Sequence, residues 1–187
     1  MIFLKKFLKY AIVILMVFSF LKSVSAEYKK KIYDFKIESL TGDSIDFSKH
    51  KNKAILLVNV ASKCGFTNQY TDLQKLWDTY RNEGLLVVGF PSNQFGGQEP
   101  ESNLDIKKFC ETNFNINFPM TVKIDVKGEN ATPIYKWAKE NYGNAAVPKW
   151  NFYKILINND GTIFNTYSSI TKPLSSKLIT DIEKIIN

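Results

Sequence analysis

The chain contains two cysteines, Cys64 and Cys110, and these thiols are its strongest candidates for chemistry. Cys64 stands between Lys63 and Gly65, directly after an apolar run and ahead of a helical pattern that begins at Tyr70. A thiol near the positive end of a helix dipole and beside a lysine is favoured as the thiolate, which is the nucleophilic form of cysteine. The position therefore indicates a reactive thiol. The alternative is a free cysteine that packs as a small hydrophobic side chain.

Other kinds of site find little support in the sequence. The single histidine, His50, lies in the polar stretch SKHKNK, and we expect it to be a solvated loop residue. One histidine and two distant cysteines do not have the spacing of a metal site, and we expect no cofactor. A pair of cysteines in an exported chain is also compatible with a structural disulfide, and this alternative stays open.

The first 26 residues have the pattern of a secretory signal peptide. Lysines at positions 5, 6 and 9 precede an apolar block from Tyr10 to Leu21, and the small residues of Val24-Ser25-Ala26 follow. A membrane span needs about 20 apolar residues, and this block is shorter. We therefore expect an exported protein, periplasmic or secreted, whose mature chain is a single domain over residues 27–187. An uncleaved membrane anchor is the alternative.

The mature chain carries too little positive charge to indicate a polyanionic partner. The whole chain has a formal charge of +7, and four of its lysines, at positions 5, 6, 9 and 22, lie in the expected signal peptide, so about +3 (7 − 4) remains. No basic cluster alternates with aromatic residues. We therefore expect neither nucleic acid nor an anionic membrane surface as a partner.

The remaining pattern predicts alternating strands and helices. Two continuous apolar runs, Ala54–Val60 and Leu85–Phe90, fit strands that are buried on both faces. A helix from Tyr70 to Arg81 joins them, so the two strands should be parallel and form a right-handed βαβ unit. The other expected elements are an N-terminal hairpin around Thr41-Gly42-Asp43, a helix over 103–114, a strand over 120–126, a helix from Thr132 to Gly143, a hairpin of strands 153–158 and 162–167, and a closing helix that Pro173 opens and whose core residues are Leu174, Leu178, Ile182, Ile185 and Ile186.

Several helix starts carry candidate capping residues. Thr67 or Asn68 can cap the first helix, Ser102 or Asn103 the second, and Thr132 the third. The order of elements predicts one α/β domain, a sandwich of helices around a central mixed sheet. Cys64 and the loop PSNQFGGQEPES each follow the carboxyl end of a parallel strand, so the two segments should meet at one edge of that sheet.

Three segments, NVASKCGFTNQY, FPSNQFGGQEP and KWNFYKILINNDG, resemble the signature segments of the glutathione peroxidase family in order and spacing. The resemblance covers nearly all of the mature chain and implies a thioredoxin-like fold and the reduction of hydrogen peroxide and organic or lipid hydroperoxides. It makes Cys64 the peroxide-attacking residue, with Gln98, Trp150 and Asn151 as its polar partners. Amide and indole N–H groups suit this role because they donate hydrogen bonds without competing as nucleophiles.

Cys110 falls on the apolar stripe of the expected 103–114 helix, so we expect it to be buried on that helix. The resemblance gives it a role, that of the resolving cysteine in members that use thioredoxin. Cys64 would become a sulfenic acid, the 103–114 helix would open, and Cys110 would close a disulfide that a thioredoxin-like protein or glutathione reduces. The insertion of the tetrameric members is absent between Trp137 and Trp150, so we expect a monomer. A redox relay and a non-catalytic domain with a structural disulfide remain as alternatives.

Overall fold

The computed structural model describes residues 28–187, and the expected signal peptide, residues 1–26, lies outside the described residues. Short 3-10 helices, strands and α-helices alternate along the chain. In order they are η1 (Ile32–Asp34), β1 (Lys36–Glu38), β2 (Ser44–Asp46), η2 (Phe47–His50), β3 (Ala54–Val60), α2 (Gln69–Tyr80), β4 (Leu85–Pro91), α3 (Asn103–Phe114), α4 (Pro133–Tyr142), η3 (Gly143–Ala146), β5 (Lys154–Ile157), β6 (Ile163–Tyr167) and α5 (Ser176–Ile186).

The central sheet has four strands in the order β4-β3-β5-β6. β3 is parallel to β4 and antiparallel to β5, so that Ile55 lies opposite Leu86 on one side and Ile157 on the other. Every residue of β3 and β4 is buried, which explains why both strands read as continuous apolar runs. The predicted mixed sheet and its parallel βαβ unit are confirmed, and the arrangement is a thioredoxin-like fold.

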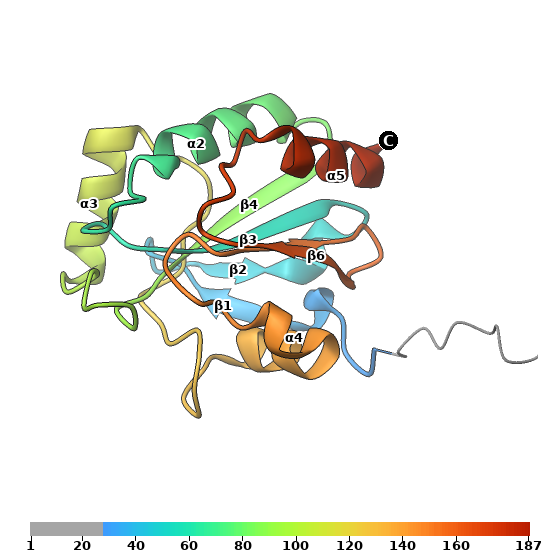
Figure 1. The fold of residues 1–187 in the computed structure, drawn as a ribbon, viewed down its shortest axis with the longest axis horizontal. Helices are drawn as coiled ribbons and strands as arrows, with labels where there is room; N and C mark the ends of the chain where they lie inside the picture. The colour runs from blue at the N-terminus through green and yellow to red at the C-terminus, as the bar shows by residue number, and fades with distance from the viewer. Residues whose placement is uncertain (1–27) are drawn as a thin grey trace, which may run out of the picture.

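Helices cover both faces of this sheet. α2 and α5 lie together on one face, and α4 lies on the other face with the β1–β2 hairpin nearby (Figure 1). Successive residues of β3 therefore point into two separate cores: Leu56 packs on the side of α2 and α5, and Leu57 on the side of α4. Among residues 28–187, no helix has the length and apolar character that a membrane crossing requires.

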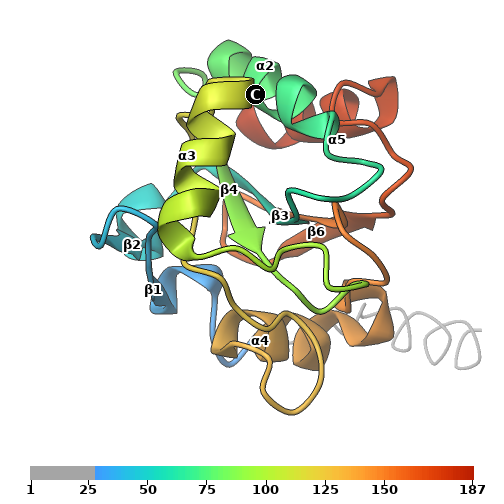
Figure 2. The ribbon, with the colours of Figure 1, turned by 90° about the vertical axis from the view of Figure 1, so that its left-hand side faces the viewer.

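The helix α3 stands at the edge of the sheet where β4 ends (Figure 2). The Ser102 side chain accepts a hydrogen bond from the Asp105 N–H and caps the start of α3, as predicted. The helix is capped by Asn115, which adopts the left-handed conformation with φ of 51°. Its N–H donates hydrogen bonds to the carbonyls of Cys110 and Glu111.

Two predicted elements are wrong in part. The strand expected over 120–126 is reduced to isolated bridges, in which Met120 pairs with Gly89 and Thr121 with Ser39. The segment is shared between the edge of β4 and the hairpin, so it forms no continuous ladder with either. The closing helix begins at Ser176, because the Ser175 N–H closes a turn onto the Lys172 carbonyl and leaves Pro173 and Leu174 ahead of the helix.

Two predicted helix caps are confirmed in position but lack the expected side-chain hydrogen bond. Asn68 occupies the N-cap position of α2 and Thr132 that of α4, and neither side chain makes a capping hydrogen bond. Thr67, the other candidate for α2, is used elsewhere, in the loop that holds Cys64.

Candidate active site

Cys64 lies in the turn between β3 and α2, and its side chain is nearly buried, with 8% exposure. Its N–H donates to the hydroxyl of Thr67 at 3.0 Å, and that hydroxyl donates to the Ala61 carbonyl at 2.9 Å. The Phe66 N–H points at the Cys64 sulfur, with 3.4 Å between nitrogen and sulfur. The loop therefore fixes the position of the sulfur and directs a backbone N–H donor toward it.

The cationic neighbour that the sequence offered to Cys64 is engaged elsewhere. The Lys63 ammonium forms an ion pair with Glu101, so its charge is partly compensated. The helix α2 begins at Gln69, five positions after the cysteine, and the direct donor to the sulfur is the Phe66 N–H in the turn. The polar contact of the sulfur therefore comes from the loop, whereas the Lys63 ammonium contacts Glu101.

A buried amide, Asn151, is paired with a partly buried one, Gln98, on the neighbouring segments. The Asn151 Nδ2 donates to the Gln98 Oε1 at 2.9 Å and lies 3.5 Å from the Phe95 carbonyl oxygen. Asn151 is fully buried. Because the Gln98 oxygen already accepts from Asn151, the Nε2 of Gln98 remains as the donor that this side chain can offer to another group.

Two backbone contacts join this amide pair to the cysteine loop. The Lys63 N–H donates to the Gln98 carbonyl at 3.0 Å, and the Ser62 N–H donates to the Glu99 carboxylate at 2.9 Å. The two loops that follow β3 and β4 therefore meet at one edge of the sheet, as the topology predicted (Figure 2).

Trp150 completes the cluster at the surface. It is 40% exposed, and its ring centroid lies 6.0 Å from that of Phe95. Gly96 has a φ of +67°, and a Cβ built on it would lie 3.6 Å from side-chain atoms of both Gln98 and Trp150. The side chains of Gln98 and Trp150 therefore both pack beside Gly96, and a larger residue at position 96 would contact both of them.

Cys110 lies on a different element, the inner face of α3, and both cysteines are free thiols. It is 1% exposed, and burial raises the pKa of its thiol to about 12, with a smaller opposing effect from the neighbouring Tyr70 hydroxyl. The predicted burial of Cys110 on the helix is confirmed. At neutral pH the buried thiol is protonated and a poor nucleophile.

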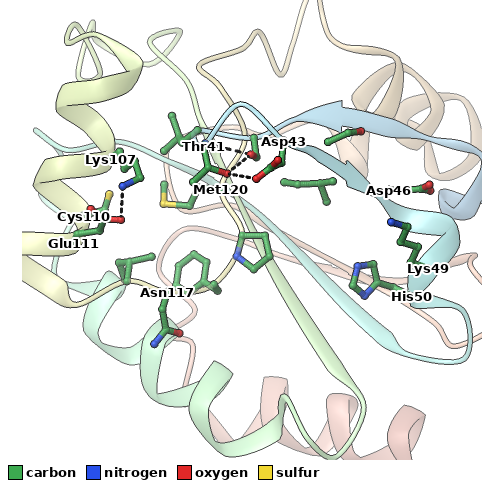
Figure 3. Close-up of a pocket in the computed structure, with 17 residues that line it drawn as sticks. Thr41, Asp43, Asp46, Lys49, His50, Lys107, Cys110, Glu111, Asn117 and Met120 are labelled. Carbon is green, nitrogen blue, oxygen red and sulfur yellow. Dashed lines mark hydrogen bonds and ion pairs between the residues drawn. The ribbon is translucent and has the colours of Figure 1, made fainter.

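A cavity of about 400 Å³ borders Cys110 between α3 and the β1–β2 hairpin (Figure 3). Lys107, Cys110 and Glu111 line one end, and Lys49 and His50 line the other (Figure 3). Apolar residues of the hairpin and of the segment after α3 form much of the wall between them. The helix α3 is therefore not fully packed on this side.

His50 departs from the prediction of a solvated loop residue. It ends η2, is half-buried, and its Nδ1 is buried without a hydrogen-bond partner. Burial, together with nearby Lys53, lowers its pKa. Residues 28–187 contain no group of histidine, cysteine and acidic side chains that could hold a metal ion.

Three residues of the site region were not identified from the sequence. Thr67 organises the Cys64 loop, and a hydroxyl three positions after the cysteine is the available signal. Glu99 is fully buried with one carboxylate oxygen unpartnered, and burial raises its pKa. Lys154 is a fully buried amine in β5, which the sequence marks only as a charged residue inside an apolar strand.

The fold and the site together define a class of protein. A nearly buried thiol stands on a turn before a helix of a thioredoxin-like domain, in a loop that is hydrogen-bonded to the segment of the Gln98–Asn151 pair, with a second buried thiol on an adjacent helix. This arrangement suits thiol-based redox chemistry, in which a cysteine attacks an electrophilic oxygen or sulfur.

The chain belongs to the glutathione peroxidase family, whose model, described as glutathione peroxidase, matches residues 32–139. It is 42% identical over 166 residues to a probable phospholipid hydroperoxide glutathione peroxidase of Citrus sinensis, covering 87% of this chain and 98% of that one. It is 42% identical over 156 residues to a glutathione peroxidase-like peroxiredoxin of Schizosaccharomyces pombe, covering 82% and 98%. The crystal structure of T. cruzi GPX1 matches with a TM-score of 0.66 at 31% identity, covering 84% and 97%.

Proposed function

We propose that this protein is a thiol peroxidase that reduces hydrogen peroxide and organic or lipid hydroperoxides at Cys64. The observation that carries the proposal is the Gln98–Asn151 amide pair, whose Gln98 carbonyl accepts a hydrogen bond from the Lys63 N–H of the cysteine loop. The Gln98 Nε2 remains as a donor in the segment that borders this loop. Trp150 adds an indole at the exposed side of the same cluster.

In the first step the Cys64 thiolate attacks the terminal oxygen of the hydroperoxide. An S–O bond forms as the O–O bond breaks, and the proton given up by the thiol ends on the leaving oxygen, which departs as an alcohol or water. Negative charge moves from sulfur to the leaving oxygen during this step. Donors such as the Gln98 amide and the Trp150 indole lower the barrier when they face the oxygen on which that charge develops.

In the second step Cys110 resolves the sulfenic acid. Its sulfur attacks the Cys64 sulfur, the S–O bond breaks, and the hydroxide leaves as water with the proton of the Cys110 thiol. Because Cys110 is buried on α3 with a pKa of about 12, the helix has to open before the thiol becomes a competent nucleophile. The cavity beside α3 leaves room for that motion. A thioredoxin-like protein or glutathione then reduces the disulfide.

Two single substitutions test this sequence of steps. Cys64→Ser should abolish hydroperoxide reduction, whereas Cys110→Ser should allow one turnover and block repeated turnover with thioredoxin. Hydroperoxide consumption is followed with hydrogen peroxide and with a phospholipid hydroperoxide, and thioredoxin and glutathione are supplied separately. Full steady-state activity of Cys110→Ser with thioredoxin would refute the resolving role. A wild-type protein that exchanges disulfides but ignores hydroperoxides would favour a redox relay instead.

We also propose that the protein is exported through its N-terminal signal and acts as a monomer. The support is the pattern of residues 1–26 and the lack of the oligomerising insertion in the sequence. N-terminal sequencing of the protein from its native host and sedimentation of the purified mature chain test the two points. An intact N-terminus on membrane-bound protein would indicate an anchor.

A further inference from the structure

A fully buried lysine lies behind the site. Lys154 is the first residue of β5, lies opposite Val58 and Tyr167 in the sheet, and has no exposed surface. Its side chain shares a face of the strand with Leu156, so it points into the core under α2 and α5. Lysine is almost never fully buried without a carboxylate partner, and such a partner would normally explain it.

The amine of Lys154 is held by neutral acceptors. Its Nζ donates to the Gln69 Oε1 at 2.8 Å and to the Phe152 carbonyl at 2.7 Å. No ion pair in the described part of the chain includes it. Burial lowers the pKa of this amine to about 7. A neutral amine has two N–H groups, which match the two acceptors, whereas an ammonium would leave a third donor buried and unpaired.

One of the two bonds secures the turn that presents Trp150 and Asn151. Phe152, the next residue, has a φ of 62°, a left-handed conformation that is unfavourable for a bulky side chain. Its N–H donates to the Asn59 carbonyl at 2.6 Å, and its own carbonyl accepts from the Lys154 amine. The backbone on both sides of the strained residue is therefore fixed, and with it the direction in which the preceding two side chains point.

The other bond secures the start of α2. Gln69 is the first residue of that helix, and its Nε2 donates to the Ser169 carbonyl at 2.6 Å, while its oxygen accepts from Lys154. The turn before this helix is the one that carries Cys64. A single buried amine thus connects the two segments that have to keep a fixed relative position if the thiol and the Gln98 amide that Asn151 orients are to act on one hydroperoxide.

We propose that Lys154 is a positioning residue for hydroperoxide reduction, because its amine ties the Trp150–Asn151 turn to the first residue of the helix behind Cys64. This inference rests on the proposed function of Cys64, Trp150 and Asn151. It also accounts for the presence of a buried amine that neither a carboxylate nor solvent stabilises.

The test separates the placement of the polar groups from the reactivity of the thiol itself. Lys154→Met keeps an unbranched apolar side chain, one heavy atom shorter, and removes both hydrogen bonds. Reduced protein is mixed with hydrogen peroxide and, separately, with iodoacetamide, and the oxidation and alkylation of Cys64 are followed by mass spectrometry. Only the first reaction needs donors at the leaving oxygen. An exposed lysine of the β6–α5 loop gives the matched control, Lys172→Met.

The expected result is a split between the two rates. Because a displacement of about 1 Å can cost on the order of 100-fold in rate, Lys154→Met should slow oxidation by about 10- to 100-fold and change alkylation by only about twofold. Gln69→Leu should give a smaller split, and the double variant should resemble Lys154→Met, because both changes interrupt the same connection. Lys172→Met should leave both rates unchanged.

Other outcomes would overturn the inference. An unchanged oxidation rate in folded Lys154→Met, or equal losses in oxidation and alkylation, would show that Lys154 does not position the polar groups. Should Lys154→Met fail to fold, Gln69→Leu decides, since the absence of any split in that variant overturns the inference. Failure of the proposed function is distinguishable, because wild-type protein would then not react with hydrogen peroxide, or Cys64→Ser would react equally well.

Discussion

Removing the N-terminal cap of α3 should accelerate the formation of the disulfide between Cys64 and Cys110. The Ser102 hydroxyl accepts from the Asp105 N–H at 3.2 Å and donates to the Asp105 carboxylate at 2.6 Å. Ser102→Ala removes both contacts, and the loss of an N-cap destabilises a helix by about 1 kcal/mol. If α3 opens in rapid equilibrium before Cys110 attacks, 1 kcal/mol raises the open population, and hence the rate, by about fivefold.

The assay follows a single turnover. Fully reduced protein receives one equivalent of hydrogen peroxide, free thiols are blocked with N-ethylmaleimide at successive times, and mass spectrometry measures sulfenic acid and disulfide. We expect Ser102→Ala to form disulfide about fivefold faster than wild type at an unchanged rate of Cys64 oxidation. Ser102→Thr is the matched control, because a threonine hydroxyl can still accept from the Asp105 N–H and donate to its carboxylate, and it should preserve the wild-type rate.

The result that would refute the reasoning is an equal or slower rate of disulfide formation in Ser102→Ala. Such a result would mean that Cys110 reaches Cys64 without opening of the first turns of α3. The buried thiol would then need another route to the sulfenic acid, such as opening at the Asn115 end of the helix.

Three further predictions concern buried polar groups. Folding lowers the pKa of Lys154 from 10.5 to about 7, so between these pH values the unfolded state binds more protons than the folded state. The free energy of unfolding of the wild type, relative to that of Lys154→Met, should therefore rise by roughly 4 kcal/mol from pH 7 to pH 10.5. Urea titration at each pH measures this difference. Burial raises the pKa of Glu99, so the folded state holds this proton to a higher pH than the unfolded state does. The free energy of unfolding should therefore fall as the pH rises above 4.5, the ordinary pKa of this carboxyl, and Glu99→Gln should remove that loss in the same titration. Asn151→Ala should slow Cys64 oxidation by about 10- to 100-fold in stopped-flow measurements, because the Gln98 amide loses the hydrogen bond that orients it; a rate equal to wild type would exclude this role.

If Cys64 and Cys110 formed a structural disulfide, the fold would depend on that bridge, and the structure does not favour this alternative. Both thiols are free and buried in a packed core, so the domain has its complete fold without a bridge. Under the peroxidase mechanism, the disulfide is an intermediate that forms only after α3 moves. Reduced protein should therefore be well folded, which a comparison of reduced and oxidised protein in thermal unfolding checks directly.

The sequence predicted most elements whose signals are local. The two all-apolar strands and the cap at Ser102 depend on residues close together in the chain, and they appear as expected. The apolar pattern of segment 120–126 predicts a full strand, because it does not reveal that β4 and the hairpin share this segment. Pro173 predicts a helix start, because the turn that Ser175 closes is not visible in the pattern.

The sequence alone determined the βαβ unit, the place of Cys64 at the end of a buried strand and the helical face that buries Cys110, because hydrophobic period and strand topology follow from neighbours along the chain. The tertiary structure alone decided that Gln98 and Asn151 orient each other and that Thr67 serves the cysteine loop. It also decided that Lys154 joins two distant segments. Such contacts bring together side chains that lie far apart in the chain, and a hydrogen bond of about 3 Å exists only once packing has fixed the backbone of both partners.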